Sequence, residues 1–187
     1  MNINNSIDTF LDFMKLPNGT PLVSVDFIDW LITNGFFTKP AAIAHHGNHT
    51  GGLFEHSLAV AQTLVEITDR LNIRWRDERS PYIVGMFHDI CKVDDYVIDV
   101  AEGTATPDEN TKWTRNKEKI LNGHGDKSVM MLSQSINLTE EELLCIRFHM
   151  GAYETDNWNE YDRAIRKYDT VLWTHTADMF AAKVLDK

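Results

Sequence analysis

The sequence predicts an all-α fold with one small β-hairpin inserted between its helices. Apolar residues recur every three or four positions over most of the chain, and only 10 glycines and 5 prolines interrupt its 187 residues. Hydrophobic residues make up 43% of this length, which is enough to bury one substantial core. Because no repeat, linker or block of charge divides the chain, we expect a single domain over residues 1–187.

Three helices are predicted in the first half of the chain. Ser24 is a favoured N-cap residue, and Pro81 suits the first turn of a helix. Within the helical spacing that follows, His56 and His88 fall on the apolar, buried sides of their helices. The predicted helices cover residues 25–32, 53–71 and 81–91.

The helical periodicity fails between residues 94 and 122. Residues 96–100 have the composition of a strand, residues 103–110 are rich in turn formers, and residues 111–116 can form a return strand. This segment therefore predicts a small hairpin or ordered loop.

Helical spacing resumes in the last third of the chain. Thr139 and Glu142 form a capping box, which predicts a helix start with particular clarity. His149 lies on the inner face of that helix, and Asp178 lies inward on the last helix, where a lone carboxylate is costly. The predicted helices run from the end of the Gly123–Gly125 corner to about residue 137, over 139–150 and over about 168–185.

The net charge excludes some classes of partner. The chain has 18 Lys and Arg against 28 Asp and Glu, a net charge of −10, which repels phosphate backbones and anionic membranes and disfavours stable binding to duplex nucleic acid. Cys91 and Cys145 lie in apolar stretches and are interpreted as reduced thiols. Residues 1–14 hold no cationic cluster, and no run of about 18 apolar residues occurs. We expect a soluble, cytoplasmic protein that does not contact membranes.

Histidine and aspartate side chains gather at core-facing positions. Burying both Asp89 and Asp178 requires a cation, and a divalent metal would supply it. On a helix, His88 and Asp89 diverge by about 100°, so an ion above the ridge between them is within reach of both. Imidazole together with carboxylate suits Mn, Fe, Co, Ni or Zn better than Ca, and Mg stays open.

The order of these residues resembles that of the HD-domain metal-dependent phosphohydrolase superfamily. The matching segments are GGLFEHS at 51–57, MFHDICK at 86–92 and TAD at 176–178. The resemblance spans about residues 41–183, which leaves 1–40 as an N-terminal helical extension packed on a helical bundle. It implies hydrolysis of a phosphate ester by water that the metal activates.

The resemblance also implies a set of metal ligands. His124 and His149 lie where branches of the superfamily with two metals carry additional ligands; alternatively, both contact the substrate phosphate in an enzyme with one metal. Asp89 would bridge two ions and be catalytic. Cys91 stands where many relatives have glycine, and the absence of a Gly-Tyr-Pro signature disfavours the cyclic dinucleotide phosphodiesterases. The implied ligands are His56, His88, Asp89 and Asp178 for one ion, and His124 and His149 for the other.

Further polar residues are candidates for contact with the substrate. Lys92 is either a catalytic phosphate clamp or a helix cap. His175 is a candidate general acid or a hydrogen-bond partner of a metal ligand. The alternative is that it makes only a structural hydrogen bond. The basic residues near Gly151 form either a base-and-phosphate pocket or a solvated helix face. The candidates are His46, Lys92, Tyr153, Arg163, Lys167 and His175.

Three functions are compatible with these patterns. The first is hydrolysis of a phosphoester or phosphoanhydride of a nucleotide or similar small molecule, which suits an acidic protein. The second is 3′-to-5′ exonuclease activity on single-stranded nucleic acid, because the motifs also resemble the HD domain of a bacterial exoribonuclease family; those relatives carry an additional OB-type domain. The third is a metal-stabilised regulatory module without turnover. One or two ions per chain and the homo-oligomeric state stay open.

Overall fold

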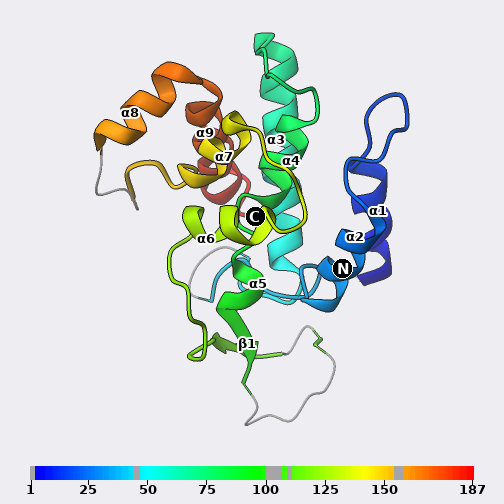
Figure 1. Cartoon of the computed structure of the whole chain (residues 1–187). Helices are drawn as coiled ribbons and strands as arrows, with labels where there is room; N and C mark the ends of the chain where they lie inside the picture. The colour runs from blue at the N-terminus through cyan, green and yellow to red at the C-terminus, as the bar shows by residue number, and fades with distance from the viewer. Residues whose placement is uncertain (1–2, 44–46, 100–106, 109–110, 154–157) are drawn as a thin grey trace.

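The computed structural model describes residues 3–43, 47–99, 107–108, 111–153 and 158–187. These residues form a helical bundle with a two-stranded hairpin at one end (Figure 1). Within them, no helix combines the length and the apolar character needed to cross a membrane. The elements are α1 (Ile3–Phe13), α2 (Val25–Thr33), α3 (Gly52–Leu71), α4 (Ser80–Phe87), α5 (Lys92–Asp95), β1 (Tyr96–Ile98), β2 (Trp113–Arg115), α6 (Gly125–Leu132), α7 (Glu140–Arg147), the 3₁₀ turn Gly151–Tyr153, α8 (Trp158–Lys167) and α9 (Thr170–Lys183).

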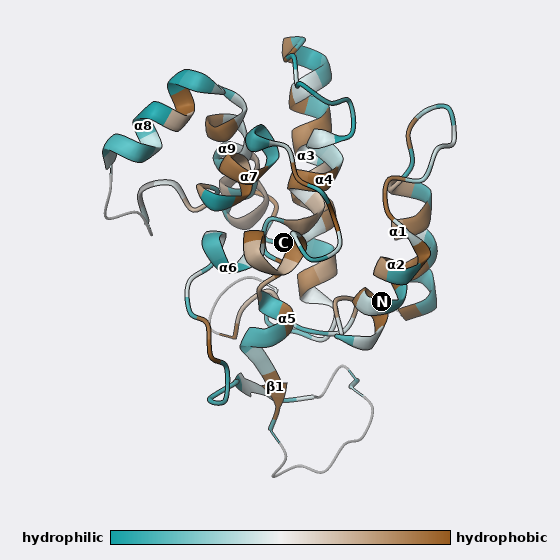
Figure 2. Cartoon of the chain, in the orientation of Figure 1, coloured by the Kyte–Doolittle hydropathy of each residue, from teal (hydrophilic) through white to brown (hydrophobic). Residues whose placement is uncertain are grey.

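The core is built around α3, which packs against α4 on one side and α9 on another, while α7 packs against α9 and α6. Hydropathy follows this arrangement: α4 is largely hydrophobic and buried, whereas α8 is mostly hydrophilic (Figure 2). Aromatic rings join the N-terminal helices to this core. Phe10 of α1 and Phe27 of α2 lie with their ring centroids 6.2 and 5.3 Å from that of Phe87.

The fold class predicted from the sequence is confirmed, and so are the two helix starts with side-chain caps. The Ser24 hydroxyl accepts a hydrogen bond from Phe27 N at 3.2 Å. Thr139 and Glu142 form the reciprocal capping box, with distances of 3.2 and 2.8 Å. These starts were predictable because each depends on residues three positions apart.

Four predicted helices are shorter than expected, and the one predicted over 168–185 covers Thr170–Lys183. The helix expected over 81–91 ends at Phe87, because the amides of Ile90 and Lys92 bond to carbonyls three residues back and tighten the chain into turns. The helix expected to reach residue 137 ends at Leu132, and the helix expected to reach residue 150 ends at Arg147. Residues that follow α4 and α7 therefore lie in turns rather than in helices.

The hairpin is present, with strands shorter than predicted. Strands β1 and β2 are antiparallel, and Tyr96 lies opposite Arg115. A network of ion pairs anchors the hairpin to the bundle: the ammonium of Lys127 on α6, whose side chain is only 1% exposed, lies 2.7 Å from Asp94 and 2.8 Å from Asp95. Lys119 also contacts Asp95, at 2.8 Å. Two helices, α1 and α8, were not among the individual helices that the periodicity predicted.

Candidate metal centre

Four segments that are distant in sequence supply one cluster of imidazole and carboxylate groups. His56 comes from α3 and Asp178 from α9. His88 and Asp89 come from the tight turn after α4, and His149 follows the end of α7. All five side chains are almost completely buried. The structure thus brings together five of the six predicted ligands.

The first group of ligand atoms consists of His56, His88 and Asp178. The Nε2 atoms of the two histidines are 3.2 Å apart. Asp178 Oδ1 lies 3.1 Å from Nε2 of His56 and 3.8 Å from Nε2 of His88. These three atoms lie close enough together to hold one metal ion.

The other ring nitrogens of these histidines support that interpretation. Nδ1 of His88 lies 2.8 Å from the carbonyl oxygen of Gly85, and Nδ1 of His56 lies 3.0 Å from the main-chain oxygen of Lys187. Each Nδ1 therefore donates to a main-chain oxygen, which makes Nε2 the atom of each ring that would bind a metal. Two imidazoles and a carboxylate form a donor set that fits a divalent transition metal.

The second group shares His88 and adds Asp89 and His149. Nε2 of His149 lies 3.4 Å from Asp89 Oδ1, and this buried nitrogen makes no hydrogen bond among the described residues. Its Nδ1 is 2.7 Å from the carbonyl oxygen of Ile146, which again leaves Nε2 as the ligand atom. The structure therefore groups His149 with the His-Asp pair.

Packing between α3 and α4 sets the distance between His56 and His88. A Cβ built on Gly85 would lie 2.4 Å from Ala61 Cα, so only glycine allows the two helices to approach this closely. Gly85 is not among the residues that the sequence patterns predicted to shape the site. Its signal is a glycine inside an apolar helix, which usually indicates a close backbone approach.

Burial and neighbouring charges both shift the pKa values of the residues in the cluster. Burial lowers the pKa of His88 to about 4. Burial also disfavours charge on His56, but the hydrogen bond and charge of Asp178 outweigh it and raise the pKa of this imidazole. The reverse competition applies to Asp178: burial alone would raise its pKa, whereas the histidines, His56 first, lower it to about 2. The carboxylates are therefore ionised and available as ligands at neutral pH.

Lys92 lies beside the second group. Its Nζ is 4.0 Å from Asp89 Oδ2 and 3.3 Å from Nε2 of His124. Burial disfavours its charge, but Asp89 outweighs that effect, and the pKa of Lys92 is raised. Because the ammonium can donate to Nε2 of His124, this histidine contacts Lys92 rather than joining the two groups of ligand atoms. A metal-binding role for His124 stays a prediction.

His175 contacts the backbone next to the cluster. Its Nδ1 lies 2.7 Å from the main-chain oxygen of His149. The ring lies against Gly151, where a Cβ would come within 2.7 Å of it. This placement can orient the chain that carries His149; contact with a substrate stays a prediction.

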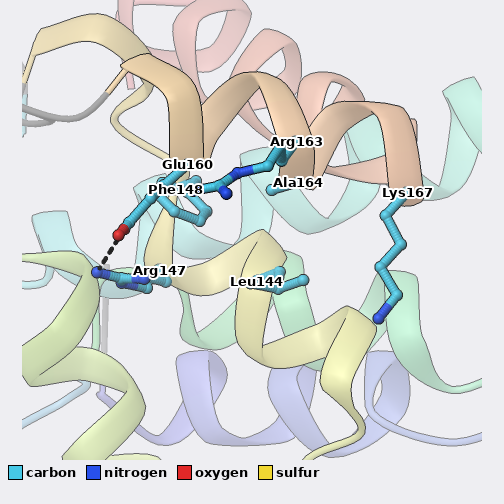
Figure 3. Close-up of a pocket in the computed structure, with 7 residues that line it drawn as sticks. All are labelled: Leu144, Arg147, Phe148, Glu160, Arg163, Ala164 and Lys167. Carbon is cyan, nitrogen blue, oxygen red and sulfur yellow. Dashed lines mark ion pairs between the residues drawn. The ribbon is translucent and has the colours of Figure 1, made fainter.

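The remaining candidate substrate residues lie elsewhere or outside the described residues. His46 is among the residues that the structure does not describe, and Tyr153 is 73% exposed. Arg163 and Lys167 line a pocket of about 290 Å³ between α7 and α8, which contains none of the cluster residues (Figure 3). In and beside this pocket, Arg147 pairs with Glu160 at 3.2 Å, and Lys167 pairs with Glu140. The role of these residues in substrate binding stays a prediction.

Comparison with known proteins identifies one family. A family model described as HD domain matches residues 53–173, more than half of the chain. The matched range contains His56, His88, Asp89 and His149 and ends before Asp178. No curated protein and no solved structure gives a significant match.

Proposed function

This chain belongs to the HD domain family, within the metal-dependent phosphohydrolases, and on that premise we propose that it hydrolyses a phosphoester or phosphoanhydride of a nucleotide or similar small molecule. The match confirms the resemblance recognised in the sequence. The observation that carries the proposal is the convergence of the His56 and His88 Nε2 atoms on Asp178, with both Nδ1 atoms committed to main-chain oxygens.

In this proposal, one set of residues binds the metal and Lys92 binds the phosphate. His56, His88, Asp178, Asp89 and His149 would hold one or two divalent ions, which would polarise a phosphoryl oxygen and activate water for attack. Asp89 also lies beside the buried ammonium of Lys92, which places this positive charge next to the predicted metal ligands. Lys92 can bind a phosphoryl oxygen and neutralise the charge that develops on it.

The charge distribution favours a small substrate. The chain carries a net charge of −10, and within the described part of the chain Lys92 is the ammonium paired with a carboxylate of the cluster, at 4.0 Å from Asp89. One ammonium beside metal ligands suits one phosphate group, whereas a nucleic-acid strand needs an extended basic groove. This difference supports a nucleotide or similar molecule over a polynucleotide.

The test is a metal and substrate screen. Protein stripped with chelator is reloaded with Mn, Fe, Co, Ni, Zn or Mg and assayed for phosphate release from nucleoside mono-, di-, tri- and cyclic phosphates. Asp89→Asn is expected to lose both metal and activity, because it removes a charged ligand. Asp162→Asn is the matched control, since Asp162 is exposed on α8 and pairs with Arg166; it is expected to behave like the wild type.

Two other outcomes would replace the proposal. Cleavage of a labelled single-stranded oligonucleotide from its 3′ end, with no release of phosphate from mononucleotides, would indicate the exonuclease alternative. Stoichiometric metal binding without turnover on any nucleotide, aryl phosphate or aryl phosphodiester would indicate a non-catalytic module stabilised by its metal.

A further inference from the structure

The last residues of the chain reach the metal centre. After α9 ends at Lys183, the chain turns back, and the main-chain oxygen of Lys187 lies 3.0 Å from Nδ1 of His56. The Lys187 ammonium lies 3.5 Å from Glu55 on the same helix, α3. The C-terminal segment 184–187 therefore contacts α3 directly beside a metal ligand, and the C-terminus is drawn near the middle of the molecule in Figure 1.

This contact is unlike those of the other two histidines. Nδ1 of His88 and Nδ1 of His149 each bond to a carbonyl three residues earlier in their own segments, namely those of Gly85 and Ile146. Their orientation is thus set locally, as the chain turns. His56 instead takes its partner from a residue 131 positions away.

We propose that the C-terminal segment 184–187 is a positioning element that sets the ring orientation and tautomer of His56, and thereby the metal affinity of the first group. A hydrogen bond from Nδ1 keeps a proton on that nitrogen and leaves Nε2 as the atom that would bind a metal. Without this bond, the neutral ring can instead place its proton on Nε2, which faces Asp178 at 3.1 Å. The inference rests on the metal-binding part of the proposed function and is independent of the substrate.

One backbone conformation places the segment there. Asp186 has a φ of 55°, in the left-handed region, and the amide of Lys187 donates to the carbonyl of Ala181 at 3.1 Å. This left-handed residue and this hydrogen bond turn the end of the chain back along the last turn of α9. Because α9 also carries Asp178, the end of this helix positions His56 while its middle supplies a ligand.

Two substitutions at Asp186 isolate this role. Asp186→Gly removes the carboxylate and keeps the left-handed conformation accessible, whereas Asp186→Val removes the same charge and strongly disfavours that conformation. Asp186 is exposed and belongs to neither group of ligand atoms. A third protein, which lacks residues 185–187, removes the contact directly.

The measurement is Co²⁺ binding to metal-free protein, followed by competition with a chelator and by the visible spectrum of the bound cobalt. Asp186→Val and the truncated protein are expected to bind Co²⁺ about 10-fold more weakly, with a changed cobalt spectrum. Asp186→Gly is expected to stay within about 2-fold of the wild type. In the metal-free proteins, the ¹⁵N shift of His56 Nδ1 should indicate a protonated, hydrogen-bonded nitrogen for the wild type and Asp186→Gly only.

The outcomes separate this inference from the proposed function. Equal Co²⁺ affinity and equal spectra for all four proteins would overturn the positioning role while leaving the metal centre intact. The same would follow if Asp186→Gly weakened binding as much as Asp186→Val, because the lost charge would then be the cause. Failure of the wild type to bind Co²⁺ would instead contradict the metal centre itself. Circular dichroism of each metal-free protein verifies that it is folded.

Discussion

Replacing Gly85 with alanine tests whether helix packing sets the geometry of the metal centre. The new Cβ would lie 2.4 Å from Ala61 Cα and 2.9 Å from Ala61 Cβ, whereas carbon atoms in contact prefer about 3.5–4.0 Å. The helices α3 and α4 must therefore separate by about 1 Å. His56 on α3 and His88 after α4 would move apart with them, although their Nε2 atoms now lie 3.2 Å from each other.

Two opposing terms set the magnitude of this effect. Alanine is a better helix former than glycine by about 1 kcal/mol, and overpacking a filled core costs about 1–3 kcal/mol. The contact is with backbone, which cannot rotate away, so we take the cost near the upper end, about 3 kcal/mol. The free energy of unfolding should fall by about 2 kcal/mol, which lowers the Tm of a chain of this size by about 4–8 °C.

The assay combines thermal unfolding of the metal-free protein with Co²⁺ titration. The variant is expected to melt earlier and to bind Co²⁺ at least about 10-fold more weakly, because metal ligands tolerate only small displacements. An alanine variant that is as stable as the wild type, or more stable, would refute the packing argument. A less stable variant with undiminished affinity for Co²⁺ would refute the link from packing to the site.

Three further predictions concern the buried charges. Lys127→Met should destabilise the protein by about 3 kcal/mol, since it leaves Asp95 dependent on Lys119; urea unfolding measures this, and an unchanged midpoint would contradict it. Burial would raise the pKa of Asp178, but its histidine neighbours hold it at about 2 in the folded state. Its contribution is thus complete above its unfolded pKa of about 3.9 and is lost as pH falls toward 2, so metal-free wild type should lose about 2 kcal/mol relative to Asp178→Asn over that window; parallel stability curves would argue against this. Lys92→Ala should retain the bound metal, measured by elemental analysis, while turnover falls; equal loss of metal content would show that Lys92 supports the ligands instead.

Features that depend on neighbouring residues were predictable from the sequence. The caps at Ser24 and Thr139 need only residues within one helical turn, and the structure has both. The apolar spacing also identified which face of α3 is buried, and with it His56. The His-Asp pair and the distant Asp178 named the ligand types before any geometry was known.

Helix ends and neighbours in space required the tertiary structure. Continuing α4 to residue 91 satisfied the periodicity, yet the chain tightens after Phe87, which places His88 and Asp89 in a turn. Arg163 and Lys167 follow Gly151 closely in sequence but line a pocket on the side of α7 that packs against α8. Spacing along the chain does not report on which side of a helix a later segment packs.

The sequence by itself determined the class of fold, the residue types that can bind a metal and the family. It determined these because helix propensity, caps and motif spacing are properties of short segments. Only the tertiary structure shows that Gly85 lets α3 pack closely against α4. It also shows that the main-chain oxygen of Lys187 lies within hydrogen-bond distance of His56, 131 positions away in the sequence. Such contacts arise from the packing of whole helices, and every residue carries a main-chain oxygen, so no side-chain pattern predicts which one His56 contacts.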